Sequence, residues 1–293
     1  MFFSPPKAII GSIELKKCEK APRKENMNIK SIIRFFGIHK IPLVHLLYSK
    51  ISNFKFPNQD RIVSCHGLQI LLRNPRKSII GRSIFSTGLW EPEVTQFISS
   101  KVRQGMTVFD IGADIGYYSL LLAKLVGPTG LVFSFEPIPK AKWYLDKNIE
   151  MNGLDNVRSF DFALFDEPGV ACLEAPLTLS KINLSKKKLS GKDIQVEMKV
   201  FDEWKAKGEL NRVDLVKLDV EGAELNVLRG MKATLQNQKP AILVEVHSQE
   251  LKSFGFSPSD LIEFLSEFGY QIDPVDKLEI DFSQSNLTIF CQS

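Results

Sequence analysis

The sequence predicts an α/β fold built around a mostly parallel, doubly wound β-sheet. The first observation is that, from about residue 91 onward, short runs of β-forming residues alternate with longer segments of helical periodicity. The second is that residues 132–135 and 215–218 are almost wholly apolar, as strands buried on both faces of a sheet should be. The third is composition: 293 residues, 44% hydrophobic and 25% charged, suffice for one large α/β domain with an appendage.

Turn residues and changes in hydrophobic periodicity divide the chain into predicted helices and strands. A turn at Asn152-Gly153 ends one helix, and strand-like alternation between Pro168 and Trp204, around the polar run SKKKLSGKD, predicts an inserted β-hairpin. Helices are expected at 91–103, 116–126, about 140–151 and 257–272, and strands at 107–111, from 130, within 156–166 and 213–222, at 241–247 and at 286–292.

Residues 1–57 are predicted to form a basic N-terminal arm that precedes the main domain at 58–293. The arm contains 11 lysines and arginines and 3 acidic residues, whereas the remainder carries 27 basic and 31 acidic residues. The arm is expected to be disordered to about residue 26, because that stretch has no sustained period. Apolar stripes then predict short amphipathic helices between 28 and 50. These helices can pack on the main domain, which we favour, or lie on an anionic membrane.

Composition also bounds the partners and the location. The mildly acidic main domain argues against binding of nucleic acid. The chain's four cysteines, Cys18, Cys65, Cys172 and Cys291, fit neither a zinc spacing nor a disulfide framework. We therefore expect reduced thiols in a cytoplasmic protein, with peripheral membrane contact through the arm as the open alternative.

The stretch VFDIGADIGYYSLLLA, which begins at Val108, predicts a ligand-binding join between a buried strand and a helix. Gly112 and Gly116 frame the turn in the pattern G-x-x-x-G. A dinucleotide site has G-x-G-x-x-G, whose second glycine lets the backbone approach a pyrophosphate. Asp114 occupies that position here, and its carboxylate repels phosphate but attracts an ammonium group. The ligand should therefore carry a positive end and no phosphates, which S-adenosylmethionine does.

An acidic residue, Glu136, ends the next strand. Its carboxylate can accept hydrogen bonds from both hydroxyls of a ribose. Enzymes that use NAD place an acid at the same point, so Glu136 predicts nucleoside binding without choosing between the cofactors. The alternative is that Glu136 caps the helix after Pro137, just as Asp110 and the two glycines could form a purely structural turn.

Charged residues also gather at the ends of two later strands. Within VDLVKLDVEGAELNVLRGM, four charged residues stand at or just after the end of the strand: Lys217, Asp219, Glu221 and Glu224. LVEVH then delivers Glu245 and His247 to the end of the neighbouring strand. Open α/β sheets bind ligands along this edge, so the charges predict an acceptor site in which His247 could act as a base. The alternative is a salt-bridged turn with a helix cap at Ala223.

These segments resemble the FkbM-type, S-adenosylmethionine-dependent methyltransferases. The resemblance rests on LWEPEV, VFDIGADIGYYSLLLA, FSFEP, NVRSFDFALFD, VDLVKLDVEGAELNVLRG and ILVEVH, in the family's order, from about residue 88 to 247. It implies a class I methyltransferase fold, a Rossmann-like doubly wound seven-stranded sheet whose last strand is antiparallel. It also implies methyl transfer to a hydroxyl, often on a sugar or natural product. Asp114 stands where the family commonly has Asn.

We therefore predict an S-adenosylmethionine-dependent O-methyltransferase that acts on a sugar, a glycan or a small natural product. Asp219 and His247 are the candidate bases, and Glu221 is expected to position one of them. No metal ligand is predicted. The predicted cofactor-binding residues are Asp110, Gly112, Asp114, Gly116, Tyr117, Glu136 and Ala163.

Three alternatives remain open at this stage. The chain could bind the cofactor without catalysis, although the charged strand ends argue against that. An NAD-dependent oxidoreductase would need the missing middle glycine. A metal-dependent O-methyltransferase could use Asp219, Glu221 and Glu224 as ligands, although three acids on one turn and helix start are a weak indication of convergent ligands.

Overall fold

A computed structural model describes residues 56–173, 182–183, 194–208, 210–275 and 286–293. The predictions made for the N-terminal arm up to residue 55, including its disordered start and its amphipathic helices, lie outside the described residues. Cys18 lies outside them as well. The account of the fold that follows is confined to the described ranges.

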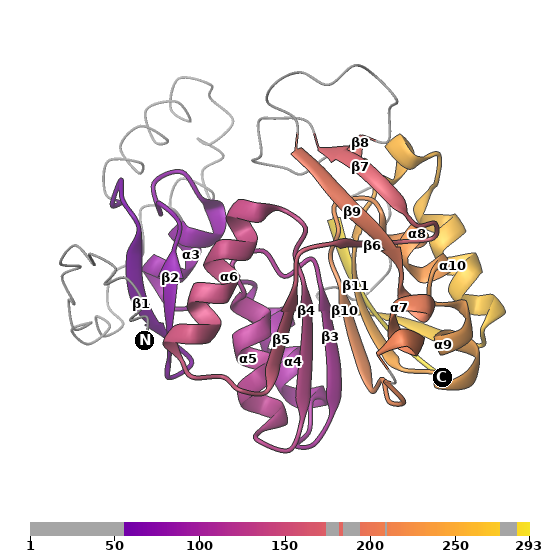
Figure 1. The fold of residues 1–293 in the computed structure, drawn as a ribbon, viewed down its shortest axis with the longest axis horizontal. Coiled ribbons are helices and arrows are strands. Elements are labelled where there is room, and N and C mark those ends of the chain that lie inside the picture. The colour runs from indigo at the N-terminus through magenta and orange to yellow at the C-terminus, as the bar shows by residue number, and fades with distance from the viewer. Residues whose placement is uncertain (1–55, 174–181, 184–193, 209, 276–285) are drawn as a thin grey trace, which may run out of the picture.

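The alternation of strands and helices predicted for the main domain is confirmed (Figure 1). Helices begin close to the expected positions, since Pro139 and Pro258 each occupy the first turn of a helix, where a missing N–H costs nothing. The order is β1 (Arg61–Cys65), β2 (Leu68–Leu72), α3 (Ile79–Thr87), α4 (Pro92–Lys101), β3 (Thr107–Ile111), α5 (Tyr117–Val126), β4 (Leu131–Phe135), α6 (Pro139–Met151), β5 (Val157–Phe160), β6 (Ala163–Phe165), β7 (Gly169–Leu173), β8 (Ile182–Asn183), β9 (Ile194–Val200), α7 (Phe201–Lys207), β10 (Leu215–Leu218), α8 (Glu224–Arg229), α9 (Lys232–Asn237), β11 (Ala241–His247), the 3-10 turn η2 (Leu251–Phe254), α10 (Pro258–Glu267), β12 (Gln271–Pro274) and β13 (Asn286–Gln292).

The central sheet has seven strands in the order β12-β13-β11-β10-β3-β4-β5. Pairs β11–β10, β10–β3, β3–β4 and β4–β5 are parallel, whereas β13 is antiparallel to both of its neighbours. The strand order reverses between β3 and β10, which is where open α/β sheets form their ligand crevice. The predicted class I methyltransferase topology, including the antiparallel last strand, is confirmed.

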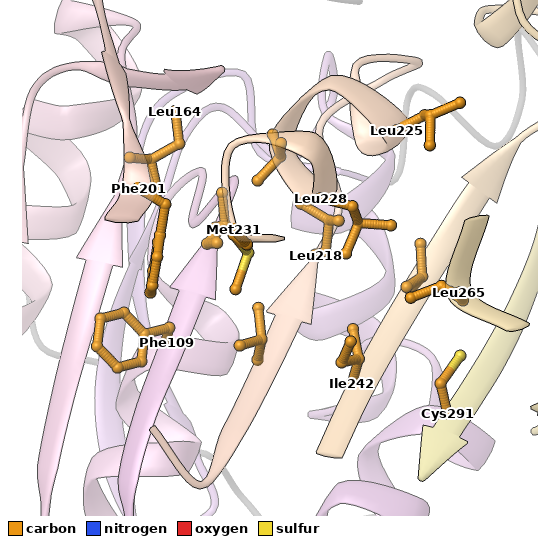
Figure 2. Close-up of a cluster of buried hydrophobic side chains, with 14 of the residues drawn as sticks. Phe109, Leu164, Phe201, Leu218, Leu225, Leu228, Met231, Ile242, Leu265 and Cys291 are labelled. Atoms are coloured by element: carbon orange, nitrogen blue, oxygen red, sulfur yellow. The ribbon is translucent and has the colours of Figure 1, made fainter. Parts of the chain in front are cut away.

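The inner strands β3, β4 and β10 are buried on both faces, which explains their apolar sequences. Along β3, for example, Val108 packs into the core on one face of the sheet and Phe109 into the core on the other. Helices α4, α5 and α6 cover the first face, and α7, α8, α9 and α10 cover the second (Figure 1). Figure 2 shows the second core, in which Phe109 and Phe201 from β3 and α7 lie near Met231. The described cysteines are free thiols, and Cys291 of β13 is buried in this core.

One predicted strand is divided in the structure. Residues 156–166 were expected to form a single strand, but β5 belongs to the central sheet and β6 to a second sheet of order β6-β9-β7-β8. The chain changes sheet at Asp161-Phe162 because β6 pairs in parallel with β9 rather than with β4. The inserted hairpin is confirmed in β7 and β9, which pair antiparallel from Gly169 opposite Met198 to Leu173 opposite Ile194. Its last residues form helix α7 instead of strand.

A β-hairpin and a helix that the sequence did not predict precede the central sheet. Strands β1 and β2 pair antiparallel, and β2 lies beside α6 (Figure 1). Asn148 of α6 holds this edge, because its side chain accepts from the backbone N–H of Leu71 at 2.6 Å and donates to the carbonyl of the same residue at 3.3 Å. The segment from Arg73 to Glu91 is thereby held at the carboxyl ends of the central strands, where it lines a large cavity.

Candidate active site

A cavity of about 950 Å³ lies at the carboxyl ends of the central strands. Ligand pockets usually span roughly 300–1,000 Å³, so this cavity lies at the upper end of that range. Its walls come from the ends of β3, β4, β6, β10 and β11 and from the 73–91 segment. Of the predicted site residues, the cavity is lined by Gly112, Asp114, Glu136, Ala163, Asp219, Glu221 and His247.

Asp110 lies beneath the cavity rather than in its wall. The carboxylate is fully buried, and its Oδ2 accepts a 2.6 Å hydrogen bond from Ser119. Within the described ranges Oδ1 has no hydrogen-bond partner, and it lies 3.9 Å from the Lys217 ammonium. Burial raises the pKa of Asp110, and the Lys217 charge opposes that rise. Asp110 therefore does not contact a ligand in the cavity directly, and its charge instead helps to hold the Lys217 ammonium beneath the site.

The two glycines of the loop allow close contacts within the protein itself. Gly112 and Gly116 have φ of +86° and +91°, which strongly favour glycine. A Cβ at Gly112 would overlap the carbonyl oxygen of Asp219, and one at Gly116 would lie 2.7 Å from Leu145 Cδ1. Gly112 thus lets the β3 loop touch the β10 loop, and Gly116 lets helix α5 begin against α6.

Asp114 and Glu136 face each other across the predicted nucleoside side of the cavity. The Asp114 backbone N–H donates to Glu136 Oε2 at 2.9 Å, and the Ile138 N–H donates to Oε1 at 2.8 Å. Burial and then the nearby Asp114 charge raise the pKa of Glu136 to about 8, and burial also raises the pKa of Asp114. Glu136 thus holds the residue before α6, although the N-cap of that helix is Ile138 and has no side-chain capping bond. Each Glu136 oxygen nevertheless retains a lone pair for a ligand hydroxyl.

Two further residues predicted to bind the cofactor have different positions. Ala163, at the start of β6, lines the cavity because β6 leaves the central sheet at this point. Tyr117 does not line it. The Tyr117 hydroxyl lies 2.9 Å from His66 Nε2 and 3.1 Å from Thr95 Oγ1, within the core beneath α5. The structure thus gives Tyr117 a packing position, because the side chain at the start of α5 points away from the strand ends.

Asp219 and Glu221 enter the cavity from the turn that follows β10. Asp219 Oδ2 lies 3.0 Å from the Lys217 ammonium. Burial lowers the pKa of Lys217, but the charges of Asp219 and Asp110 outweigh this effect and raise the pKa. Glu221 has a φ of +53°, a strained conformation for a residue with a Cβ. Burial raises the pKa of Glu221. Lys217 therefore stays charged and fixes one oxygen of Asp219.

His247 ends β11 and points into the same group of charges. Its Nδ1 lies 2.8 Å from Glu224 Oε1, a carboxylate that is fully buried and also accepts from the Gly222 N–H at 2.9 Å. Its Nε2 lies 3.8 Å from Asp219 Oδ1 and 3.6 Å from Glu221 Oε2. Burial lowers the pKa of His247, but the Glu224 hydrogen bond and the surrounding carboxylates outweigh it and raise the pKa to about 10. The three predicted catalytic residues are thus brought together, with the imidazole as the inner member.

Two more carboxylates belong to this group although they were not among the predicted site residues. Glu245 Oε1 lies 3.6 Å from His247 Nε2 and accepts a 3.0 Å hydrogen bond from Asn286. Glu91, from the LWEPEV motif, accepts a 2.7 Å hydrogen bond from Tyr118 and has a φ of +41°. Burial raises the pKa of Glu91 and raises that of Glu245 to about 8. The sequence had placed Glu245 at this strand end with His247, although without a catalytic or binding role of its own.

The side of the cavity formed by the 73–91 segment is basic. Arg73 and Lys77 line it together with Lys140 from the start of α6. No pattern in the sequence pointed to Arg73 or Lys77, because they follow a hairpin that was itself not predicted. The cavity therefore has an acidic floor at the ends of β10 and β11 and a basic outer wall.

The metal alternative considered from the sequence required Asp219, Glu221 and Glu224 to converge. Among the described residues, they do not form a group of converging ligand atoms. Glu224 is oriented toward Nδ1 of His247, whereas the other two acids face Nε2.

Comparison with known proteins identifies this arrangement. The model of the methyltransferase FkbM domain matches residues 110–272, which is more than half of the chain and includes the ends of β3, β4, β10 and β11. The chain belongs to the FkbM methyltransferase family. Its cofactor is S-adenosylmethionine.

Relatives of this FkbM-family chain include characterised methyltransferases. The hexuronic acid methyltransferase AglP of Haloferax volcanii is 27% identical over 177 residues, 60% of this chain and 68% of that protein. The 2-O-methyltransferase NoeI of Sinorhizobium fredii is 27% identical over 205 residues, 63% of this chain and 83% of that protein. The crystal structure of methyltransferase FkbM from Methylobacillus flagellatus aligns with a TM-score of 0.45 and 15% identity over 71% of this chain and 46% of that chain.

The residues of this FkbM-family site fit S-adenosylmethionine. Glu136, held by two backbone N–H groups and with lone pairs to spare, suits the hydroxyls of the ribose. Carboxylates line the cavity beside Glu136, where a dinucleotide-binding protein would have a glycine-rich loop. Their negative charge suits the amino group and the sulfonium of the cofactor, whereas it would repel a pyrophosphate.

Proposed function

We propose that this chain transfers a methyl group from S-adenosylmethionine to a hydroxyl oxygen of a sugar or glycan. The observation that carries the proposal is the single cavity that joins Glu136 and Asp114 to the charged group at the ends of β10 and β11. Family membership supports methyl transfer, and the arrangement of polar side chains supports oxygen as the acceptor atom.

The bound cofactor would supply a methyl carbon already activated by a positively charged sulfur. The residues of this chain then have to bind the cofactor and the acceptor, align the acceptor hydroxyl with the methyl carbon and remove the hydroxyl proton. The acceptor oxygen forms a bond to the methyl carbon while the carbon–sulfur bond breaks, and that electron pair stays on sulfur. Alignment alone can contribute on the order of 7–11 kcal/mol.

Asp219 and Glu221 are the best-placed groups to take the hydroxyl proton. Their side chains are 24% and 34% exposed, whereas that of His247 is only 5% exposed. A carboxylate in reach of the acceptor can therefore accept the proton while His247 positions it by charge. A well-placed base typically adds roughly 10²–10⁴ in rate.

The proposal of a sugar acceptor is supported by the relatives and by the chemistry of the cavity. AglP is named for a hexuronic acid and NoeI for 2-O-methylation. Sugars present several neighbouring hydroxyl donors, and the cavity floor presents carboxylate acceptors, which make charge-assisted hydrogen bonds. A hydroxylated natural product would satisfy the same groups, and it remains the second candidate within this reaction class.

The test is a transfer assay with the full chain and methyl-labelled S-adenosylmethionine. Fractionated glycans, lipids and small molecules serve as acceptors, and formation of the demethylated cofactor is followed in parallel. We expect label in a carbohydrate fraction, and an Asp219→Asn variant that binds the cofactor but transfers little. Label confined to lipid would overturn the sugar assignment, and cofactor binding without transfer to any fraction would favour the binding-only alternative.

Cofactor choice can be tested separately by calorimetry. The chain should bind S-adenosylmethionine and its demethylated product and should not bind NAD, because Asp114 takes the place of the pyrophosphate-facing glycine. Saturable binding of NAD alone would overturn both the cofactor and the reaction.

The N-terminal arm is proposed to pack on the domain with its basic face in water. Among the described residues, no helix has the length and apolar character that a membrane crossing requires. Deletion of residues 1–50 should make the chain aggregate or lower its melting temperature. A soluble truncation that has lost binding to anionic vesicles would favour the membrane alternative. The cytoplasmic location stays a prediction.

A further inference from the structure

Three ligand-type side chains converge at the ends of β10 and β11. Asp219, Glu245 and His247 each offer one atom, and these atoms lie within 4.8 Å of one another. His247 Nε2 is 3.8 Å from Asp219 Oδ1 and 3.6 Å from Glu245 Oε1. These separations are too long for hydrogen bonds. They exceed the roughly 3.0 Å between adjacent ligands of an octahedral ion with bonds of roughly 2.1 Å, so the side chains would close by less than about 1 Å around such an ion.

The imidazole is oriented as a metal ligand would be. Its side chain is 5% exposed, and Glu224 fixes Nδ1 at 2.8 Å, so Nε2 must face the carboxylates. Within the described parts of the chain, Nε2 makes no hydrogen bond despite that burial. A histidine whose second nitrogen is held by a buried carboxylate is the usual form of a metal-binding histidine.

Neighbouring side chains hold both acids so that one oxygen of each faces Nε2. Lys217 lies 3.0 Å from Asp219 Oδ2, which leaves Oδ1 directed at His247. Asn286 donates to Glu245 Oε1 at 3.0 Å, and this oxygen keeps a second lone pair. Glu221 adds a third carboxylate at 3.6 Å from Nε2. Three acids thus face one nitrogen, so a cation bound beside Nε2 would be surrounded by carboxylate oxygens.

We propose that Asp219 Oδ1, Glu245 Oε1 and His247 Nε2 bind a divalent cation in the acceptor half of the cavity. The proposal rests on the proposed function, since the ion would act on the acceptor hydroxyl. Carboxylates suit Mg²⁺ and Mn²⁺ and imidazole suits softer ions, so Mn²⁺ fits the mixed set best. The ion would bind the acceptor oxygen as a Lewis acid, and the hydroxyl proton would pass to Glu221. The oxygen would then form its bond to the methyl carbon while the carbon–sulfur bond of the cofactor breaks and leaves its electron pair on sulfur.

Binding is tested on the full chain after removal of metal with a chelator. Titration with Mn²⁺, followed by electron paramagnetic resonance and calorimetry, should show one saturable site. Asp219→Asn, Glu245→Gln and His247→Ala should each weaken it by at least about tenfold. Glu263→Gln, which removes an exposed carboxylate of α10, is the charge-matched control and should bind Mn²⁺ as the wild type does. In the wild-type chain, Mn²⁺ should also broaden the imidazole resonances of one histidine, a readout that needs no variant.

The possible failures are distinguishable. No saturable binding of Mn²⁺, Mg²⁺ or Zn²⁺ by a chain that binds S-adenosylmethionine would overturn the metal site and leave the methyltransferase intact. Saturable binding that all three substitutions leave unchanged would overturn the ligand assignment. Transfer that survives exhaustive chelation would overturn the role of the ion, whereas loss of cofactor binding and transfer in the metal-loaded wild type would overturn the proposed function itself.

Discussion

Replacing Glu136 by Gln should stabilise the chain without ligand and weaken its binding of cofactor. Glu136 is 5% exposed, and its pKa is raised from 4.5 to about 8. Because the folded-state pKa is the higher one, the unfolded chain ionises Glu136 first, and stability falls as pH rises from about 4.5 to 8. At about 1.4 kcal/mol per pKa unit, the destabilisation above pH 8 is on the order of 5 kcal/mol at most.

The substitution removes this charge but sacrifices one hydrogen bond. Gln can accept from only one of the two backbone N–H groups, of Asp114 and Ile138, that donate to Glu136. A buried donor left unsatisfied costs about 1–3 kcal/mol, so a net gain on the order of 2–4 kcal/mol is expected at pH 8.5. At pH 5.5, where the native carboxyl is largely protonated, the gain should vanish or reverse.

Urea unfolding of the wild type and of Glu136→Gln at both pH values measures the difference, and Glu263→Gln controls for loss of a negative charge. Binding of S-adenosylmethionine should weaken by about tenfold or more, because a charge-assisted hydrogen bond contributes about 1.5–3 kcal/mol. A stability difference independent of pH would refute the argument that burial raises the pKa of Glu136 and makes its charged form destabilising.

Three other substitutions test separate parts of the site. Gly112→Ala should abolish cofactor binding and lower stability by several kcal/mol, since its Cβ would overlap the Asp219 carbonyl at a φ of +86°; soluble, cofactor-binding protein would contradict the close contact. Asp219→Asn should lower kcat by about a hundredfold while the calorimetric Kd for cofactor changes little, and equal losses in both would indicate a cofactor contact. Tyr117→Phe should leave cofactor affinity unchanged and cost about 0.5–1.5 kcal/mol in thermal unfolding, because its hydroxyl bonds to His66; a large loss of affinity would restore Tyr117 to the cofactor site.

The central sheet could be predicted because its strands are short, apolar and separated by helices of clear period. β3, for instance, was predicted from Thr107 to Ile111 and lies there. The division of residues 156–166 could not be predicted, since pairing of β6 with β9 depends on a contact more than thirty residues away in sequence. The local sequence FDFALFD has no breaker at the point where the chain changes sheet.

The site shows the same limit. Asp114, Glu136, Asp219 and His247 could be predicted because each ends a strand or follows it closely, and parallel strands bring their carboxyl ends together. Glu91 joins them from outside the sheet, where its strained φ of +41° directs it to Tyr118, and sequence has no signal for that geometry. Tyr117 was assigned to the cofactor because it follows the loop, yet which way the first side chain of a helix points depends on packing.

The contact between Gly112 and the Asp219 carbonyl fixes how the two halves of the cavity sit relative to each other. Both loops are anchored by main-chain pairing, since β3 and β10 are neighbours and the Asp219 N–H donates to the Ile111 carbonyl at 3.0 Å. Substitutions in the outer wall, residues 73–91, can therefore change which acceptor is bound, while the relative position of the cofactor side and the catalytic side of the cavity stays the same. Exchange of that wall between relatives is accordingly the route by which such an enzyme could be redirected to a new acceptor without rebuilding its chemistry.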